Sequence, residues 1–261
     1  MTLDMLFSTF DDRIVDLANR LPEQQDSVSI IICHQTDKAL PKSIQLVFDS
    51  RSDIKYFPLQ SKGVTKSRNF AIEQSQSDII FFCDDDVHYE IDLYKKLIQA
   101  YKDNPESDFI TFAYTKTGLG LHKFTKISYD HNFRSILKVG TIEVSCKRSS
   151  VYKVNEWFPE DMGAGSKYYL CDEPVFLSRL LKSGLKGRYL PVSIGEHPPE
   201  SSGIELKDIN AVVSRLYCFV RIFGGIRGRI LYFLFITKNF SRFKTLSLFF
   251  KSLLIFMKRV D

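Results

Sequence analysis

The stretch "IIFFCDDDVHY" (residues 79–89) constrains the fold of the chain more than any other. Four bulky apolar residues and a cysteine lead directly into three adjacent aspartates, Asp84, Asp85 and Asp86. A continuous apolar run of this length is typical of a strand that is buried on both faces of a parallel sheet. Adjacent carboxylates repel one another, and burial raises that cost. The stretch therefore predicts either an acidic surface turn or a site for a divalent cation.

The flanking segments predict an α/β fold. Over the first 115 residues, apolar runs typical of strands alternate with segments of helical periodicity, which predicts a doubly wound α/β sheet. Ligands in such sheets bind beyond the carboxyl ends of the strands, where the three aspartates would lie. The first strand is expected at 27–35, further strands at 43–50, 54–59, 78–83 and 108–115, a strand pair within 140–151, and helices at 65–76, with Thr65 as N-cap, and 91–105.

A second acidic pair, Asp172-Glu173, opens the segment "DEPVFLSRLLKSG" (residues 172–184). Pro174 in the first turn and Gly184 past the end predict a helix here. The helix dipole favours ionised carboxylates at a helix N-terminus, and an ionised carboxylate is what a general base requires. A plain helix cap is the alternative interpretation of the pair.

The composition is that of a folded protein. With 261 residues and 44% hydrophobic content, the chain can bury one sizeable core, and 26% charged residues with 13% aromatic residues argue against disorder. Five cysteines without a CxxC pair predict free thiols in a reducing cytosol and argue against a cysteine-based zinc site. The N-terminal sequence has no basic region before an apolar core, so no secretory signal is expected.

Charge divides the chain into two parts. Residues 205–261 hold 11 Lys/Arg and three acids, a net charge of +8, whereas residues 1–204 carry a net −3. We therefore expect two regions with different partners, residues 1–204 and a basic, amphipathic, helical region for membrane association at 205–261. On a helical projection, Lys244, Lys251, Ser252 and Lys258 fall on one side and Leu246, Phe250 and Leu254 on the other.

That tail has the pattern of a helix lying in a membrane surface. It lacks a stretch of about 20 residues free of charge, so a spanning helix is not expected. A helix packed on the catalytic domain or in an oligomer interface is the alternative. Nucleic acid is not an expected partner, because the apolar content is too high for an exposed binding groove.

The three aspartates have a geometry that suits a hard cation. In an extended segment, Asp84 and Asp86 share one face while Asp85 points away. Two carboxylates on one face can hold Mn²⁺ or Mg²⁺, with substrate phosphates completing the coordination. Such a site could hold a nucleotide diphosphate.

Five segments, taken in order, resemble family-2 glycosyltransferases of the GT-A fold. The resemblance covers about residues 27–203 and implies a GT-A catalytic domain at 1–204, a Rossmann-like mixed sheet with flanking helices, the fold of nucleotide-diphospho-sugar transferases. The segments that carry it are "VSIIICHQ", "SKGVTKSRNFAIEQ", "DIIFFCDDDVHY", "FPEDMGAGSKYYLCDEPVFLSRLLKSG" and "GEHPPESSG".

The resemblance assigns roles to individual residues. It implies Glu173 as the base that deprotonates an acceptor hydroxyl; the acids stand in the reverse of the usual family order, which leaves Asp172 as a competitor. Trp157 could stack on an acceptor sugar, with core packing as the alternative. The implied ligands of Mn²⁺ or Mg²⁺ are Asp84, Asp86 and His197, and the implied donor-binding residues are His34, Gln35, Lys62, Arg68, Asn69, Asp84 and Asp85.

The function implied by the resemblance is metal-dependent, inverting glycosyl transfer. A sugar would move from a nucleotide-diphosphate donor, expected to be a UDP-sugar, to a hydroxyl of a glycan or lipid-linked acceptor, as in the synthesis of bacterial cell-surface polysaccharide. The expected location is the cytoplasm, with peripheral association at the inner face of the cell membrane. The alternative is a non-catalytic binding protein of the same fold, tethered at the membrane, because fold does not fix activity.

Overall fold

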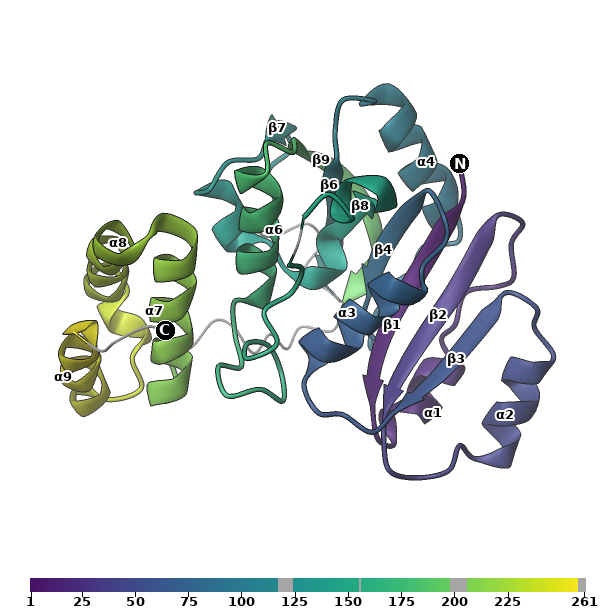
Figure 1. The fold of residues 1–261 in the computed structure, drawn as a ribbon, viewed down its shortest axis with the longest axis horizontal. Helices are drawn as coiled ribbons and strands as arrows, with labels where there is room; N and C mark the ends of the chain where they lie inside the picture. The colour runs from purple at the N-terminus through teal and green to yellow at the C-terminus, as the bar shows by residue number, and fades with distance from the viewer. Residues whose placement is uncertain (117–123, 155, 198–205, 258–261) are drawn as a thin grey trace.

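A mixed β-sheet forms the centre of the molecule (Figure 1). The computed structural model describes residues 1–116, 124–154, 156–197 and 206–257. In this part of the chain the strand order is β3-β2-β1-β4-β8-β6-β9-β5, with β7 paired to β9. The strands are β1 (Leu3–Phe10), β2 (Val28–Gln35), β3 (Ile54–Leu59), β4 (Ile79–Cys83), β5 (His88–Tyr89), β6 (Phe109–Lys116), β7 (Tyr129–Asp130), β8 (Val144–Lys147) and β9 (Gly187–His197).

The direction of the strands brings the acidic turn to one edge of the sheet. Strands β3, β2, β1 and β4 run parallel, so their carboxyl ends meet at the same edge. Strand β8 is antiparallel to both β4 and β6, whereas β6 and β9 are parallel. Asp84 follows β4 directly and therefore lies at the carboxyl edge of the parallel half, where ligands bind in sheets of this kind.

Helices cover both faces of this sheet, and three more form a separate layer at one end of the molecule (Figure 1). The flanking helices are α1 (Arg13–Ala18), α2 (Lys42–Asp49), α3 (Val64–Gln74), α4 (Leu93–Asp103), α5 (Arg148–Val151) and α6 (Asp172–Lys182), with 3₁₀ turns η1 (Ser135–Lys138) and η2 (Thr141–Glu143). The end layer consists of α7 (Ile209–Phe223), α8 (Gly225–Lys238) and α9 (Leu246–Leu254), with η3 (Phe240–Arg242) and η4 (Ile255–Met257).

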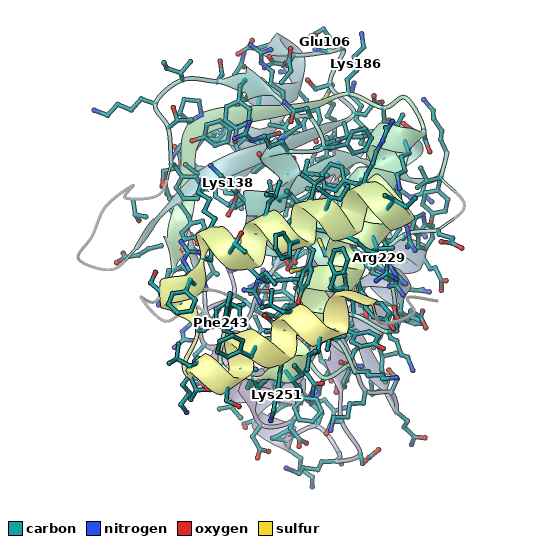
Figure 2. All side chains as sticks on the ribbon, turned by 90° about the vertical axis from the view of Figure 1, so that its left-hand side faces the viewer. Glu106, Lys138, Lys186, Arg229, Phe243 and Lys251 are labelled. Carbon is teal, nitrogen blue, oxygen red and sulfur yellow. The ribbon has the colours of Figure 1, made fainter. Side chains whose placement is uncertain are left out.

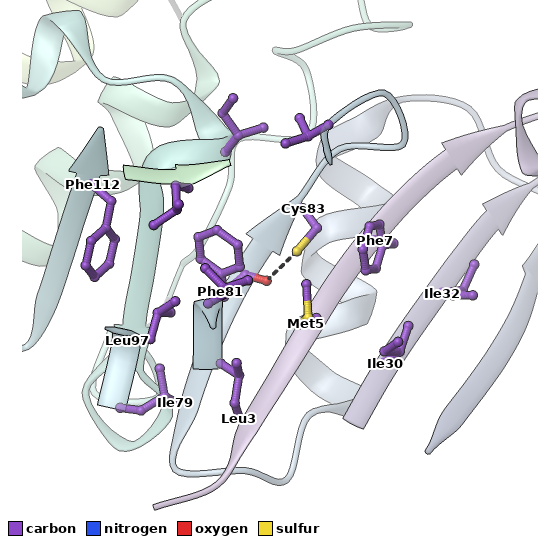
Figure 3. Close-up of a cluster of buried hydrophobic side chains, with 14 of the residues drawn as sticks. Leu3, Met5, Phe7, Ile30, Ile32, Ile79, Phe81, Cys83, Leu97 and Phe112 are labelled. Atoms are coloured by element: carbon purple, nitrogen blue, oxygen red, sulfur yellow. Dashed lines mark hydrogen bonds between the residues drawn. The ribbon is translucent and has the colours of Figure 1, made fainter. Parts of the chain in front are cut away.

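Alternation along the strands divides the core between the two faces of the sheet. Leu3, Met5 and Phe7 of β1 join a cluster that includes Phe81 and Leu97 (Figure 3). Leu6 of β1 faces the other way, into a second cluster beneath α3 and α6 that includes Ile31, Ile80, Phe82 and Phe176. Each such side chain contributes on the order of 1.5–3 kcal/mol when fully buried. The continuous apolar run of β4 is explained by this burial on both faces.

Strand β1 corrects the prediction that residues 27–35 form the first strand. It lies between β2 and β4 in the middle of the parallel half. The carboxylate of Asp4, the second residue of this strand, is buried and accepts hydrogen bonds from the backbone N–H of Gln76 at 2.7 Å and of Ser77 at 2.9 Å. These partners lie more than 70 residues away, so the local pattern of the strand gives no indication that Asp4 is satisfied.

Other local predictions are confirmed or corrected by the structure. The helices expected at 65–76, 91–105 and 172–184 and the strands expected at 54–59, 78–83 and 108–115 are confirmed within two residues at most boundaries. The segment 43–50, predicted as a strand, is helix α2, because Ile44 and Phe48 lie one turn apart and are both buried. Residues 140–151 contain one strand, β8, rather than two. The N-cap of α3 is Gly63, and the Thr65 hydroxyl instead donates to Met162 O at 2.9 Å.

The C-terminal helices pack against the sheet domain through α7. Val213 and Tyr217 of α7 share a cluster with Tyr168 and Val175, the latter on α6. The opposite side of α7 packs with α8 and α9 around Tyr232. Among the described residues, no helix is long and apolar enough to cross a membrane. The predicted domain boundary between 204 and 205 lies outside the described residues.

The closest approach of α7 and α8 generates a prediction about stability. A Cβ on Gly228 would lie 2.5 Å from Phe219 O and 2.6 Å from Val220 Cα, which are both backbone atoms, so one helix must move. We expect Gly228→Ala to lower the free energy of unfolding by roughly 1–3 kcal/mol. Gly225→Ala is the matched control in the same helix, because its Cβ would meet nothing within 4 Å. Urea unfolding followed by circular dichroism measures both, and equal stabilities would contradict the close packing.

Candidate active site

A buried arginine connects the two acidic motifs of the chain. Arg68 projects from α3, and its Nη2 lies 3.5 Å from Asp84 Oδ1 at the end of β4. Its Nη1 donates a hydrogen bond of 2.6 Å to Asp172 Oδ2 at the start of α6 and lies 3.7 Å from Glu173 Oε1. One guanidinium therefore joins carboxylates that are separated by 88 residues in the sequence.

The surroundings of Arg68 explain how a charged group is tolerated there. The guanidinium lies over the ring of Phe158, with its Cζ 5.5 Å from the ring centroid. Burial alone would lower the pKa of Arg68, but the carboxylates of Asp172, Asp84 and Glu173 outweigh it and raise the pKa. The planar fork of arginine can address two carboxylates at once, which the point charge of a lysine cannot do. Arg68 is therefore permanently charged and fixed in position.

Within the acidic turn, the three aspartates face two directions, as predicted from the alternation of an extended segment. The side chains of Asp84 and Asp86 are 34% and 38% exposed, whereas that of Asp85 is 3% exposed. Asp85 points inward, where it accepts a 2.7 Å hydrogen bond from the Thr9 hydroxyl and pairs with Arg13. Asp85 therefore anchors the turn to β1 and α1, and its carboxylate is already engaged within the protein.

The outward aspartates meet a histidine from a distant strand. His197, the last residue of β9, lies with its Nε2 3.8 Å from Asp86 Oδ1. Asp86 Oδ1 is buried and has no hydrogen-bond partner, while Oδ2 lies 3.4 Å from Arg13 Nη2. A buried carboxylate oxygen without a hydrogen bond fits a position that a cation would fill. Among the described residues, however, no group of three or more candidate ligands is close enough to form a complete metal site from protein alone.

Burial raises the pKa of several carboxyl groups at this edge. Desolvation raises the pKa of Asp84, and it raises the pKa of Asp85 to about 6 against the opposing effects of Thr9 and Arg13. Desolvation, followed by repulsion from Glu173, raises the pKa of Asp172 to about 7. The site thus holds more negative charge than Arg68 alone compensates, which favours a bound cation or a shared proton.

The two acids at the start of α6 differ in accessibility. Asp172 is buried against Arg68, and a Cβ on Gly163 would lie 3.0 Å from its Cγ. The side chain of Glu173 is 19% exposed, compared with 5% for Asp172, and it accepts a hydrogen bond from the Thr141 hydroxyl. Glu173 is therefore the acid of the pair that an incoming molecule reaches more easily.

Three residues predicted to contact the donor are bonded within the protein. His34 is buried, with Nδ1 2.9 Å from the Tyr56 hydroxyl and Nε2 2.8 Å from Asp11 O. The amide N–H groups of Gln35 donate to Ser61 O and Oγ. Asn69 pairs with both backbone groups of Phe158, each at 3.0 Å. Their hydrogen bonds connect the segments of the protein that surround the site.

The two remaining predicted residues, Lys62 and Trp157, lie beside the site. Lys62 is exposed and precedes the N-cap of α3. Trp157 lines a cleft of about 970 Å³ between α3, residues 156–161 and the side of α6 that carries Ser178 and Arg179. Its indole Nε1 donates to Val151 O at 3.1 Å, so part of the ring belongs to the core. Because Asp84, Asp172 and Glu173 do not line this cleft, it lies beside the cluster of carboxylates around Arg68 and does not include it.

Sequence reasoning did not identify four residues that shape the site. Thr9 and Arg13 hold Asp85, Thr141 holds Glu173, and the Tyr89 hydroxyl accepts a hydrogen bond of 3.0 Å from the backbone N–H of Asp84. Tyr89 lies only five residues from Asp84, whereas Thr9, Arg13 and Thr141 act across the fold. The sequence carries no local signal for contacts of this kind.

The sequence of the chain matches a known protein family. The sequence matches the family Glycosyl transferase family 2 over residues 14–151, which is more than half of the chain. The chain belongs to glycosyl transferase family 2. Family membership confirms the resemblance inferred from the motifs and makes the protein a glycosyltransferase. A search of curated protein sequences returned no match.

Solved structures of S. aureus TarS share the fold. The structure of TarS 1-349 in complex with UDP-GlcNAc matches with a TM-score of 0.71 at 17% identity, covering 100% of this chain and 82% of that chain. TarS 1-349 in complex with UDP gives 0.65 at 15% identity, with 92% and 72% coverage. TarS itself gives 0.66 at 16% identity, covering 95% of this chain and 46% of that chain. The mixed sheet with its flanking helices is thus the GT-A fold.

The shared role of Arg68 can be tested by a change that keeps its charge. Arg68→Lys cannot reach Asp84 and Asp172 together, so we expect the free energy of unfolding to fall by roughly 1.5–3 kcal/mol. Arg134→Lys, at an exposed position, is the control and should be neutral. Chemical denaturation measures both variants. A variant at position 68 as stable as the unmodified protein would contradict a bridging role.

Proposed function

We propose that this family-2 glycosyltransferase moves a sugar from a UDP-sugar to a hydroxyl of a glycan or lipid-linked acceptor, with inversion at the anomeric carbon. The observation that carries the proposal is the linkage by Arg68 of the strand-end aspartate Asp84 to the acidic pair Asp172-Glu173. It provides a place for a diphosphate and a place for a base within one site. The structural neighbours in complex with UDP-GlcNAc and UDP support a uridine diphosphate donor.

The donor site is proposed to include Mn²⁺ or Mg²⁺. Asp84 and Asp86 would hold the ion together with His197, and the unpartnered Oδ1 of Asp86 supports this fit. Such an ion supplies positive charge that stabilises the diphosphate as it leaves. Phosphate oxygens would complete the coordination, as is usual for magnesium sites, so a full set of protein ligands is not required. Exposed Arg13, 3.4 Å from Asp86, and exposed Lys62 add cationic groups that a diphosphate could contact.

The proposed reaction is a single displacement. Glu173 accepts the proton of the acceptor hydroxyl while that oxygen forms a bond to the anomeric carbon. The bond between this carbon and the diphosphate oxygen breaks, and the nucleoside diphosphate leaves with the electron pair. Attack from the face opposite the leaving group inverts the anomeric configuration. The Thr141 hydroxyl and Arg68 orient Glu173, and Asp172 holds Arg68 in place.

The acceptor is proposed to be a chain long enough to extend past the catalytic centre. The cleft beside Phe158 is lined by Trp157, Arg179 and several carboxylates, a mixture that suits the hydroxyl groups and apolar faces of sugars. An acceptor whose hydroxyl is deprotonated by Glu173 could continue into this cleft and pack against Trp157. Synthesis of a bacterial cell-surface polysaccharide or glycolipid is the process we propose for it.

We also propose that the enzyme acts in the cytoplasm, in peripheral association with the inner face of the cell membrane. Five cysteines without paired spacing and the basic, apolar C-terminal region support this location. The same composition argues against nucleic acid as a partner. A lipid-linked acceptor at that membrane would be compatible with a soluble nucleotide sugar.

Removal of either outward aspartate tests the metal site. Asp84→Asn or Asp86→Asn deletes a negative ligand, so we expect Mn²⁺-dependent affinity for UDP to fall on the order of 10–100-fold. Asp103→Asn, an exposed acid on α4, is the matched control. Calorimetric titration of UDP with and without Mn²⁺ measures the effect. If the metal does not change affinity for UDP in the unmodified protein, the metal proposal fails.

Isosteric changes within the acidic pair test the base. Glu173→Gln keeps the shape of the side chain but cannot accept a proton, so we expect normal donor binding and a rate loss of roughly 10²–10⁴-fold. Asp172→Asn should weaken the hold on Arg68 and lower stability as well as rate. The measurement is single-turnover transfer to an acceptor, alongside donor affinity.

The pattern of the two variants decides the assignment. A rate loss with full stability in Asp172→Asn, together with an active Glu173→Gln, would make Asp172 the base. Full activity in both variants would place the base elsewhere. If the unmodified protein binds UDP-sugars but neither transfers nor hydrolyses them, the non-catalytic alternative is favoured.

A further inference from the structure

The C-terminal helices expose an unusually apolar surface. Eight of the sixteen large apolar side chains that are exposed among the described residues fall between positions 226 and 254. We call this surface the outer face. It consists of Ile226, Ile230, Phe233 and Leu234 on α8, Phe240 in η3, and Leu246, Phe250 and Leu254 on α9.

The outer face does not contribute to the core of the protein. The same helices bury their other sides, where Tyr232, Ile236 and Leu248 pack with α7. The Tyr232 hydroxyl donates to Ser252 O at 2.9 Å and joins α8 to α9 from within. The sequence predicts Ser252 on the polar side of the helix, and the structure corrects this prediction because Ser252 is buried. Stability of the fold therefore does not account for the apolar outer face.

The outer face is a broad surface made by two neighbouring helices. Figure 2 shows α8 and α9 side by side across the front of the molecule, with no other helix or strand in front of them. The positions exposed on α8, 226, 230, 233 and 234, follow the spacing of one helical face, as do 246, 250 and 254 on α9. Each helix therefore carries its exposed apolar residues as one stripe along its length.

Exposed basic residues lie on or between the helices that carry the outer face, in a segment of the sequence without acids. The sequence from 209 to 260 contains no aspartate or glutamate. Five basic side chains on or between the two helices are exposed: Arg227, Lys238, Arg242, Lys244 and Lys251. The predicted contribution of Lys258 lies outside the described residues. An apolar stripe flanked by lysine and arginine is the chemistry of a helix that lies in the interface of an anionic bilayer.

We propose that the outer face docks flat on an anionic lipid bilayer, with α8 and α9 parallel to the surface. Its apolar side chains enter the boundary of the acyl chains, and the bordering lysines and arginines contact lipid phosphates. This inference rests on the peripheral association proposed above and is independent of the transfer chemistry. A second copy of the chain is a poorer occupant, because a two-fold contact would bring the like-charged borders together.

Vesicle flotation tests the proposal with the whole chain. The protein should float with vesicles of equal parts phosphatidylglycerol and phosphatidylcholine and bind at least about tenfold more weakly to pure phosphatidylcholine. High salt should reduce binding to the anionic vesicles only in part, because the apolar contact is not screened. Failure to bind the anionic vesicles would overturn the proposal.

An apolar variant isolates the outer face. Replacement of Ile230, Leu234, Phe250 and Leu254 by Gln should weaken binding to anionic vesicles at least about tenfold at every salt concentration. The matched control replaces Leu46 and Ile91, which are as exposed but lie on α2 and before α4, and should bind normally. Thermal melting confirms the fold of each variant; if the fourfold variant melts early, the pair Phe250→Gln and Leu254→Gln replaces it.

A charge variant isolates the border. Replacement of Lys238, Arg242, Lys244 and Lys251 by Gln should abolish the preference for phosphatidylglycerol and the salt dependence. The control carries the same number of Lys→Gln changes at exposed positions elsewhere, namely Lys42, Lys95, Lys102 and Lys153. Equal losses in the control would show that net charge, and not this border, governs binding and would overturn the proposal.

Two parallel measurements separate the possible causes of failure. Sedimentation would reveal an apolar variant that changes from dimer to monomer with unchanged lipid affinity, and that result would assign the outer face to a second copy and overturn the membrane proposal. Titration of UDP should be unchanged in all four variants. If the unmodified protein does not bind UDP, this result counts against the proposed function and does not affect the lipid result.

Discussion

The ion pair between Arg68 and Asp172 is the constraint on which the site depends. A guanidinium buried among carboxylates is stable only while its partners remain in place, and the loss of one buried partner typically costs about 3–5 kcal/mol. The 2.6 Å contact therefore fixes the start of α6 against α3. Gly163 leaves room for the Asp172 carboxylate, since a Cβ there would lie 3.0 Å from Asp172 Cγ. The position of Asp172 therefore depends both on the space beside Gly163 and on the charge of Arg68.

The same arginine makes two motifs into one site. Asp84 follows β4 in the parallel half of the sheet, whereas Glu173 lies in the first turn of α6. With Arg68 at 3.5 Å and 3.7 Å from these two acids, the end of β4 and the start of α6 are held in fixed relation. The proposed displacement would need such a relation between its leaving group and its base, because reacting atoms must be aligned.

Local signals predicted the parts of the site that depend on local sequence. The buried run of β4, the alternation of Asp84, Asp85 and Asp86, and the helix that starts at Asp172 follow from periodicity and position. The proximity of His197 to Asp86 could be anticipated only through resemblance to a family, because it joins β9 to the acidic turn across more than 100 residues.

The failures have the opposite origin. Strand β1 is not predicted because the carboxylate of Asp4, its second residue, is acceptable in a buried strand only with its partners Gln76 and Ser77, which tertiary structure supplies. The pairing of the Asn69 amide with the backbone of Phe158, 89 residues away, is likewise absent from the local sequence pattern, while its predicted donor contact stays a prediction. Contacts of this kind depend on the arrangement of elements in space, which no local pattern encodes.

The C-terminal helices show the same limit for amphipathic sequences. Periodicity identifies an apolar stripe but cannot say whether protein or lipid covers it, and in this chain the helices carry apolar residues on both sides. Because the inner sides of α8 and α9 pack with α7, the outer face is the apolar side of these helices that stays exposed. Because Val213 and Tyr217 of α7 pack against Val175 of α6, the helix that carries the acidic pair is in direct contact with the layer that carries the outer face. Docking of that layer on a bilayer would therefore set the orientation of Glu173 relative to the lipid surface without any element crossing the membrane.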